Sequence, residues 1–343
     1  MGSRIACHFA NIGLEVLLLD IIPKDLSPGE SEKGLDHKSP EFRNRIVNES
    51  LQTAIKSNPS PLYHKKFANR IKTGNFEDDL EKISHCDWVI EAVIEDLGIK
   101  KNLFGQVEKF RQPGSLITSN TSGIPIHLMT EGRTEDFKSH FCGTHFFNPP
   151  RYLKLLEIIP TEFTKKEVIE FFEDYGKLFL GKTTVLCKDT PAFISNRIGI
   201  YAILKAVQSM QKLGLGIDEV DRLTGTTIGR PKSATFRTSD IVGLDTLIKV
   251  ANNLHDSLEK DEQHEMFKLP EIIYELENKK WLGEKTKQGF YKKTKDKKGK
   301  TEILTLDLKT FEYKPKKKVK FASVGAAKGT DDLKQIHESD YHV

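Results

Sequence analysis

Apolar and polar residues recur along residues 1–188 in blocks that predict helices and strands in turn. Residues 5–12 have helical spacing and stop before Gly13, whereas residues 16–20 form a continuous apolar run, typical of a strand covered on both faces. Further strands are expected at residues 88–93, 115–119, 153–159 and 183–187, with another ending at 144–147, and further helices at residues 41–57, 61–71, 97–110 and 164–177. This alternation predicts an α/β domain with a mainly parallel sheet.

The pattern changes at Asp189. Thr190 and Pro191 favour a helix start, since threonine is a good N-cap and proline fits the first helical position. The run that follows, to Leu213, is apolar on most sides, so we expect it to be the buried axis of a second, all-α domain. Further helices are expected at residues 217–224, 239–258 and 270–280. The predicted division is therefore residues 1–188, residues 189–293, and a Lys-rich hairpin and linker over residues 294–343.

Composition narrows the class of protein. The 343 residues, 37% hydrophobic and 30% charged, are enough for two ordinary globular domains, and no run of about 18 apolar residues suggests a transmembrane helix. The four cysteines, without CxxC spacing, favour reduced thiols in a cytoplasmic protein over disulfides or a metal site. Residues 292–320 contain twelve lysines and four acidic residues. The positive charge of this segment alone exceeds the net charge of the whole chain, which is +4. We interpret this segment as a solvated hairpin face and expect no nucleic-acid partner.

The first twenty residues carry half of a dinucleotide-binding fingerprint. The complete Rossmann pattern needs a strand, a G-x-G-x-x-G loop that opens a helix, and an acidic residue about 20 positions on. Gly2 fits the third glycine, and Asp20 fits the carboxylate that binds the ribose hydroxyls of NAD. We therefore expect a Rossmann-like domain whose N-terminal strand is missing. An ordinary chain start and an ordinary strand-end aspartate are an equal alternative.

His145 and Glu157 are the candidate catalytic pair. His145 lies where a strand gives way to Asn148-Pro149-Pro150, and Glu157 shares one strand face with Leu155 and Ile159. A carboxylate on an apolar face is costly to bury unless it is paired, so Glu157 would hold the ring of His145 and stabilise its imidazolium. On spacing alone, a surface histidine and a strand-end glutamate that do not touch are the somewhat commoner case.

Two polar positions could polarise a substrate oxygen. Ser122 ends a Ser-Asn-Thr-Ser stretch after an apolar strand, at the sheet edge where open α/β proteins bind ligands. Asn196 lies one and a half turns into the long apolar helix, where its amide needs a partner. Taken singly, each is more often a turn residue or a satisfied core amide.

Together these motifs resemble the 3-hydroxyacyl-CoA dehydrogenase family. The matching stretches run in family order over residues 1–293, and they are Met1–Ala6 with Asp20, Val89–Glu95, Ser119–Ser122, His145–Pro149, Asp189–Arg197 and Gly283–Tyr291. The resemblance implies NAD-dependent oxidation of (S)-3-hydroxyacyl-CoA to 3-oxoacyl-CoA in fatty-acid β-oxidation. It also implies an acyl-CoA substrate, no membrane span, and a homodimer formed through the helical domain.

Carried over by position, the family's roles fall on residues of this chain. The resemblance makes His145 the general base with Glu157 as its partner, while Ser122 and Asn196 bond the reacting oxygen. The implied NAD-binding residues are Gly2, Asp20, Glu95, Lys100, Ser122 and Asn148. Ser50 and Lys65 are the implied substrate-binding residues, together with Ser122 and Asn196, and no metal is implied.

The chain also departs from the family pattern. It starts inside the glycine loop, and its Lys-rich tail looks more like long bacterial members that continue into an enoyl-CoA hydratase-like region. The alternative function is therefore a truncated, non-catalytic module that binds acyl-CoA or mediates dimers.

Overall fold

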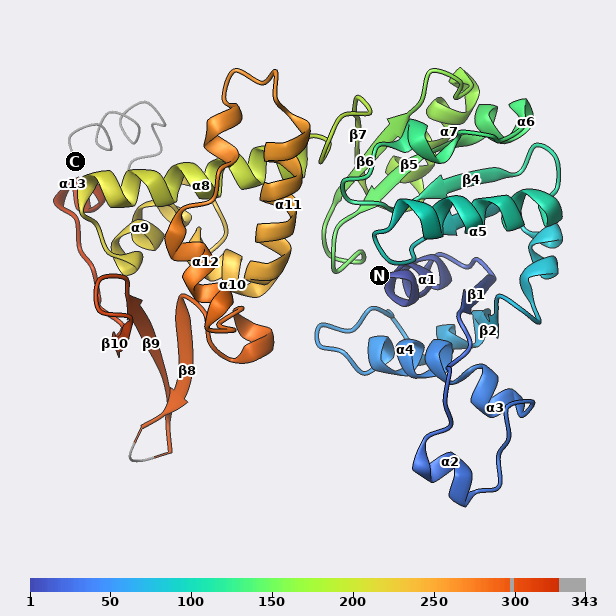
Figure 1. Ribbon diagram of the computed structural model, residues 1–343, viewed down its shortest axis with the longest axis horizontal. Coiled ribbons are helices and arrows are strands. Elements are labelled where there is room, and N and C mark those ends of the chain that lie inside the picture. The colour runs from blue at the N-terminus through green and yellow to red at the C-terminus, as the bar shows by residue number, and fades with distance from the viewer. Residues whose placement is uncertain (297–298, 327–343) are drawn as a thin grey trace. The chain divides into compact units, whose positions relative to one another are not determined.

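The computed structural model describes residues 1–296 and 299–326. The chain divides into two compact units, Met1–Ile194 and Ser195–Val343 (Figure 1). The Lys-rich hairpin and linker expected over residues 294–343 fall partly outside the described residues. Among the described residues, no helix combines the length and the apolar character needed to cross a membrane.

The first unit contains two sheets. One consists of β1 (Val16–Asp20) paired in parallel with β2 (Ile71–Asn75). The other has the order β3 (Trp88–Glu91), β4 (Leu116–Ser119), β5 (Phe141–Phe146), β6 (Leu155–Pro160) and β7 (Thr183–Leu186). Only β5 and β6 run antiparallel within it. The unit is therefore an α/β domain with a largely parallel sheet.

Helices pack on these sheets through apolar side chains. The longer helices are α1 (Gly2–Asn11), α4 (Arg45–Ile55), α5 (Leu97–Phe110) and α7 (Lys166–Leu178), and the short ones are α2 (Pro28–Glu32), α3 (Pro40–Arg43) and α6 (Glu135–Ser139). Phe104 of α5 packs in one fully buried cluster with Ile117 of β4 and Phe141 of β5, and α5 crosses this sheet in Figure 1. Cys7 and Ala10 of α1 lie in another cluster. Burial of these side chains fixes the strand ends that carry the candidate site.

The second unit is mainly helical. Its elements are α8 (Ser195–Leu213), α9 (Ile217–Leu223), α10 (Phe236–Val242), α11 (Leu244–Ser257), the 3-10 helix η5 (His264–Phe267), α12 (Glu271–Asn278) and α13 (Ala322–Ala326). Three strands, β8 (Tyr291–Lys295), β9 (Thr301–Asp307) and β10 (Glu312–Pro315), form an antiparallel sheet of order β10-β9-β8. The predicted long helix is present, and Leu204, Val207 and Met210 of α8 are buried.

Three local predictions are wrong. The helix expected over residues 61–71 is instead a 3-10 turn at Lys65–Arg70 followed by β2. The helix expected over residues 239–258 is broken at Gly243, whose φ of 98° leaves the helical region and separates α10 from α11. Glycine reaches this conformation without the steric cost that a side chain would bring.

The third error concerns the start of the long helix. Ala192 and Phe193 have φ values of 58° and 53°, which belong to the left-handed region, so Thr190 does not cap a helix there. The helix begins at Ser195, and Asn196 is its second residue and not one and a half turns inside it. Both left-handed side chains are buried, which indicates that packing holds this backbone.

The buried carboxylate of Asp240 and the partly buried carboxylate of Asp221 explain the Gly283–Tyr291 motif. Asp240 accepts hydrogen bonds from the backbone N–H groups of Phe290 (2.9 Å) and Tyr291 (2.8 Å). Asp221 accepts one from the hydroxyl of Tyr291 (2.8 Å). A side chain at Gly289 would overlap Oδ1 of Asp240, so this position requires glycine. The motif therefore joins α10 to β8 and has a structural role.

Candidate functional site

The register of two antiparallel strands places His145 opposite Glu157. His145 of β5 and Glu157 of β6 are direct cross-strand partners, with exposed fractions of only 4% and 0%. Nδ1 of His145 lies 2.7 Å from Oε2 of Glu157. Because the carboxylate holds Nδ1, Nε2 is the nitrogen left to exchange a proton with a bound molecule.

Glu157 also organises the segment that leaves β7. Its Oε1 accepts a hydrogen bond from the backbone N–H of Ile194 (3.2 Å). The ring centroid of Phe193 lies 5.8 Å from that of His145, and the ring centroid of Phe147 lies 4.4 Å from it. Burial, followed by the nearby charge of Glu157, raises the pKa of the Cys187 thiol to about 12. This thiol therefore stays protonated at neutral pH and is no nucleophile.

A second buried charge cluster joins β3 to α5. Lys100 of α5 is 1% exposed, and its Nζ lies 2.7 Å from Glu91 Oε1 and 3.5 Å from Glu95 Oε2. Ser119 at the end of β4 donates its hydroxyl proton to Glu91. The cluster thus fixes the carboxyl ends of two neighbouring parallel strands, where open α/β sheets place ligands.

Glu95 shapes the loop that carries Ser122. One carboxylate oxygen accepts hydrogen bonds from the Thr121 hydroxyl (2.6 Å) and from the N–H groups of Ser122 (3.0 Å) and Gly123 (3.1 Å). Burial disfavours ionisation of Glu95, but the Thr121 hydrogen bond and the Lys100 charge outweigh it and lower its pKa. Lys100 and the backbone N–H of Ser122 therefore both contact the ionised carboxylate of Glu95.

A cavity of about 760 Å³ lies between the two sheets of the first unit. Gly2, Asp20 and Ser50 all line it, so the structure groups three of the predicted ligand-binding residues. The first turn of α1 has no side-chain cap, and its backbone N–H groups together with the helix dipole suit an anion. A phosphate near Gly2 and hydroxyl groups near Asp20 fit the residues present.

The same cavity borders two strand edges. β1 and β3 both line it, and each is the end strand of its sheet among the described residues. The additional N-terminal strand that we expect from the incomplete glycine pattern stays a prediction.

The remaining predicted site residues lie outside these groups. Asn148 is exposed, and its side-chain oxygen accepts a hydrogen bond from Arg4 (2.8 Å). Lys65 is exposed at the start of its 3-10 turn. Asn196 lies in the first turn of α8, in the second unit.

Sequence reasoning missed Glu91 and Asp189. Glu91 is the buried partner of Lys100, and a carboxylate that ends an apolar strand nine residues before a lysine was the available signal. Asp189 accepts hydrogen bonds from the backbone N–H groups of Ile126 (2.7 Å) and His127 (2.8 Å). No local sequence pattern indicates the contact of Asp189 with Ile126, because 63 residues separate them.

Comparison with known proteins gives a consistent result over nearly the whole chain. Residues 1–190 match the family model described as "3-hydroxyacyl-CoA dehydrogenase, NAD binding domain", and residues 193–293 match "3-hydroxyacyl-CoA dehydrogenase, C-terminal domain". A probable 3-hydroxyacyl-CoA dehydrogenase of Deinococcus radiodurans is 44% identical over 305 residues, which cover 89% of this chain and 83% of that protein.

A second relative is longer than this chain. A probable 3-hydroxyacyl-CoA dehydrogenase of Bacillus subtilis is 50% identical over 328 residues, 96% of this chain but only 41% of that protein. Among solved structures, M. tuberculosis FadB2 aligns with a TM-score of 0.69 and 26% identity, covering 85% of this chain and 95% of that one.

Proposed function

Because the chain belongs to the 3-hydroxyacyl-CoA dehydrogenase family and contains its NAD-binding domain, we propose that it oxidises (S)-3-hydroxyacyl-CoA to 3-oxoacyl-CoA with NAD in fatty-acid β-oxidation. The observation that carries this proposal is the buried contact between His145 and Glu157. An imidazole held at Nδ1 by a carboxylate is suited to remove a hydroxyl proton.

In the proposed mechanism, His145 is the general base and Glu157 positions it. Nε2 of His145 takes the proton of the 3-hydroxyl group as the C3–O bond becomes a carbonyl, and Glu157 stabilises the resulting imidazolium. Ser122 and Asn196 donate hydrogen bonds to the reacting oxygen. Bound NAD supplies the acceptor for the hydride that leaves C3. Because one proton is released for each hydride transferred, higher pH favours oxidation.

The proposed cofactor site extends from α1 to the end of β4. Gly2 would hold the pyrophosphate through the N-terminus of α1, and Asp20 would bind the adenosine ribose, which excludes the extra phosphate of NADP by repulsion. The residues proposed toward the nicotinamide are Glu95, Lys100, Ser122 and Asn148. Lys100 would act through Glu91 and Glu95, since its ammonium is enclosed by those carboxylates.

The proposed substrate contacts are made by Ser50 and Lys65. Ser50 lines the cavity that Gly2 and Asp20 also line, so an acyl-CoA near Ser50 would approach the bound cofactor. Lys65 is exposed, and its charge suits a CoA phosphate. We also propose a cytoplasmic location, supported by the four free cysteines.

The test is the reverse reaction in the full-length protein. Acetoacetyl-CoA and NADH are mixed with enzyme, and NADH absorbance is followed for the wild type and for His145→Gln. We expect rapid loss of absorbance with the wild type and a rate lower by about 100-fold or more with the variant. A folded wild-type protein that oxidises no NADH would overturn the proposal.

A second candidate is a non-catalytic module that binds acyl-CoA or forms homodimers. Exposed apolar side chains in the second unit favour dimer formation, and they include Ile198, Leu213, Ile241 and Val242. Sedimentation velocity tests the dimer, and calorimetry with NADH separates the two functions. Tight NADH binding with turnover rejects a purely non-catalytic role.

A further inference from the structure

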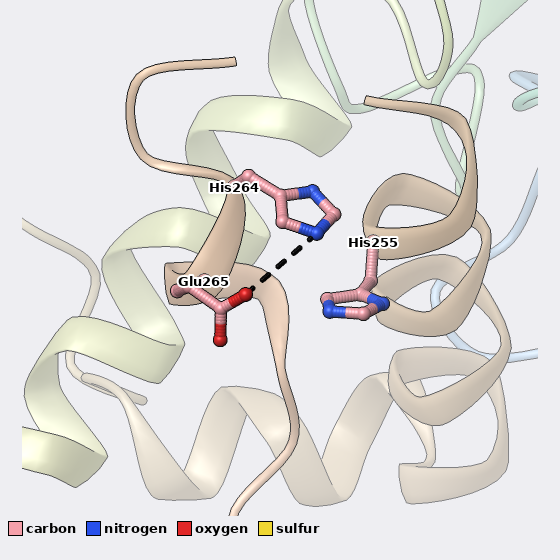
Figure 2. A group of neighbouring side chains, drawn as sticks. All are labelled: His255, His264 and Glu265. Atoms are coloured by element: carbon pink, nitrogen blue, oxygen red, sulfur yellow. Dashed lines mark ion pairs between the residues drawn. The ribbon is translucent and has the colours of Figure 1, made fainter. Parts of the chain in front are cut away.

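Two histidines and a glutamate of the second unit meet at the end of α11. His255 lies in the last turn of α11, and His264 and Glu265 begin η5 (Figure 2). One possible ligand atom from each residue lies within 4.8 Å of the other two. We propose that this cluster binds one divalent transition-metal ion, with Zn²⁺ the best match.

In each imidazole, Nδ1 contacts an oxygen atom and Nε2 is the nitrogen available to a metal ion. Nδ1 of His264 lies 3.2 Å from the carbonyl oxygen of Leu258, to which it donates. In the neutral ring Nε2 then carries no proton, and it lies 3.9 Å from Oε1 of Glu265. Nδ1 of His255 lies 3.5 Å from the carboxylate of Asp256. Metal-binding histidines usually direct their other nitrogen to a carbonyl or a carboxylate in this way.

The charge around the cluster also favours a cation. Residues 255–265 contain five carboxylates and a single lysine. One of these carboxylates, Asp261, is neutralised by an ion pair with Arg197 of α8, which leaves the local excess negative. Nearby negative charge raises the local concentration of divalent cations.

The ligand types decide which cation fits. Two imidazoles and one carboxylate form a common three-residue set for Zn²⁺, with water as the fourth ligand, whereas Ca²⁺ and Mg²⁺ prefer oxygen ligands alone. Imidazole also binds Co²⁺, Ni²⁺ and Cu²⁺, so these ions are chemical probes of the same site.

Metal binding requires a small rearrangement of the side chains. The two rings are stacked, with centroids 4.3 Å apart and an interplanar angle of 30°. Zn–N bonds of about 2.1 Å need lone pairs that converge, so each ring must turn about χ2. The side chains of His255 and His264 are 33% and 23% exposed, which leaves room for this rotation. The bound ion would then close the loop between α11 and η5.

The experiment is a metal titration of the full-length protein after treatment with a chelator. Zn²⁺ is added in competition with a chromophoric chelator of known affinity, and Co²⁺ is added separately to record its visible spectrum. We expect one site per chain with micromolar or tighter affinity, a Co²⁺ spectrum typical of four-coordinate geometry, and a higher Tm with Zn²⁺. His255→Gln and His264→Gln should each weaken binding by about tenfold or more.

Matched controls separate ligation from general charge. Glu265→Gln removes a ligand and Glu262→Gln removes an exposed carboxylate of the same loop, so only the first should weaken binding and abolish the Zn²⁺-dependent rise in Tm. His85→Gln, at an exposed histidine of the first unit, should bind as the wild type does. Absence of a saturable site, or wild-type affinity in both His255→Gln and His264→Gln, would overturn the proposal.

Discussion

Glu157 connects the proposed base to the backbone that follows β7. One carboxylate oxygen holds Nδ1 of His145, and the other accepts the N–H of Ile194. A fully buried carboxylate with two donors has little freedom to move. The ring of His145 is therefore held in one orientation before any substrate binds, which reduces the reorganisation needed for proton transfer.

Glu157→Gln tests this role at almost constant size. The amide keeps an acceptor for Ile194 but loses the negative charge that stabilises the imidazolium of His145. We expect kcat to fall by about 100-fold or more with KM for acetoacetyl-CoA nearly unchanged. Glu162→Gln, at an exposed carboxylate five residues later, is the control and should keep wild-type kinetics. A kcat for Glu157→Gln within about threefold of wild type would contradict the assigned role.

Lys100 is a buried cation that lies between the carboxylates of Glu91 and Glu95. Lys100→Met keeps a long unbranched side chain but removes the ammonium group that lies beside Glu91 and Glu95. We expect the free energy of unfolding to drop by about 3–5 kcal/mol in urea denaturation. Lys101→Met, which removes a surface pair with Glu131, should cost less than about 1 kcal/mol. Equal losses in the two variants would show that the buried cluster is not a structural anchor.

At the scale of elements, the contact between α10 and β8 contributes to the stability of the second unit. Gly289→Ala places a methyl group against the Asp240 carboxylate, which its two backbone hydrogen bonds hold in place. We expect a loss of about 1–3 kcal/mol in the free energy of unfolding, measured by denaturant titration. Gly29→Ala has open space around it and should change stability by less than about 0.5 kcal/mol. Wild-type stability in Gly289→Ala would refute the tight contact.

The raised pKa of Asp240 predicts that the stability of the protein depends on pH. Burial raises its folded pKa from 3.8 to about 6, against the effect of its backbone hydrogen bonds. Between these values the folded protein retains a proton that the unfolded chain has lost, so this group's contribution to stability falls as pH rises. The slope should approach about 1.4 kcal/mol per pH unit.

The comparison of variants isolates this contribution. Between pH 4 and 6 the stability curve of Asp240→Asn should lack the slope that Asp240 gives the wild type. Asp307, whose pKa is lowered to about 2 by the side-chain hydrogen bond from Lys314, contributes with the opposite sign and loses its stabilising effect as pH falls below 3.8. Asp307→Asn should therefore differ from wild type in its acid limb. Parallel wild-type and Asp240→Asn curves would contradict the assigned pKa.

Sequence patterns predicted the elements that have a continuous apolar run or a helical spacing of apolar residues. The strands at β1 and β3 and the helix at α5 were all expected close to their observed bounds. β2 was missed because Ile71-Lys-Thr-Gly-Asn75 is hardly apolar, and its extended form depends on parallel pairing with β1. The left-handed turn at Ala192 and Phe193 was missed because tertiary packing overrides the helix-start preference of Thr190 and Pro191.

The residues of the candidate site could be predicted from the sequence, but the contacts between them could not. Residue types and motif order indicated His145 and Glu157, yet their contact depends on the register of β5 against β6, which no local pattern fixes. The Glu91–Lys100 pair likewise depends on how α5 packs beside β3. The shared cavity of Gly2, Asp20 and Ser50 follows only from the folded first unit.

At the scale of the whole molecule, the two units contain different features of the proposed sites. The first unit holds the His145–Glu157 pair and the cavity with its helix N-terminus, while the second carries Asn196 and the proposed metal cluster. The chain spans about two-fifths of the length of its Bacillus subtilis relative.

The most direct test of the account is a single-turnover measurement of hydride transfer. NADH is bound to the full-length wild type and to His145→Gln, each is mixed with excess acetoacetyl-CoA, and NADH fluorescence is followed by stopped flow. We expect equal NADH affinity in both proteins and hydride transfer slower by about 100-fold or more in His145→Gln. Hydride transfer in His145→Gln within a few-fold of the wild type would contradict the role of His145 as the general base.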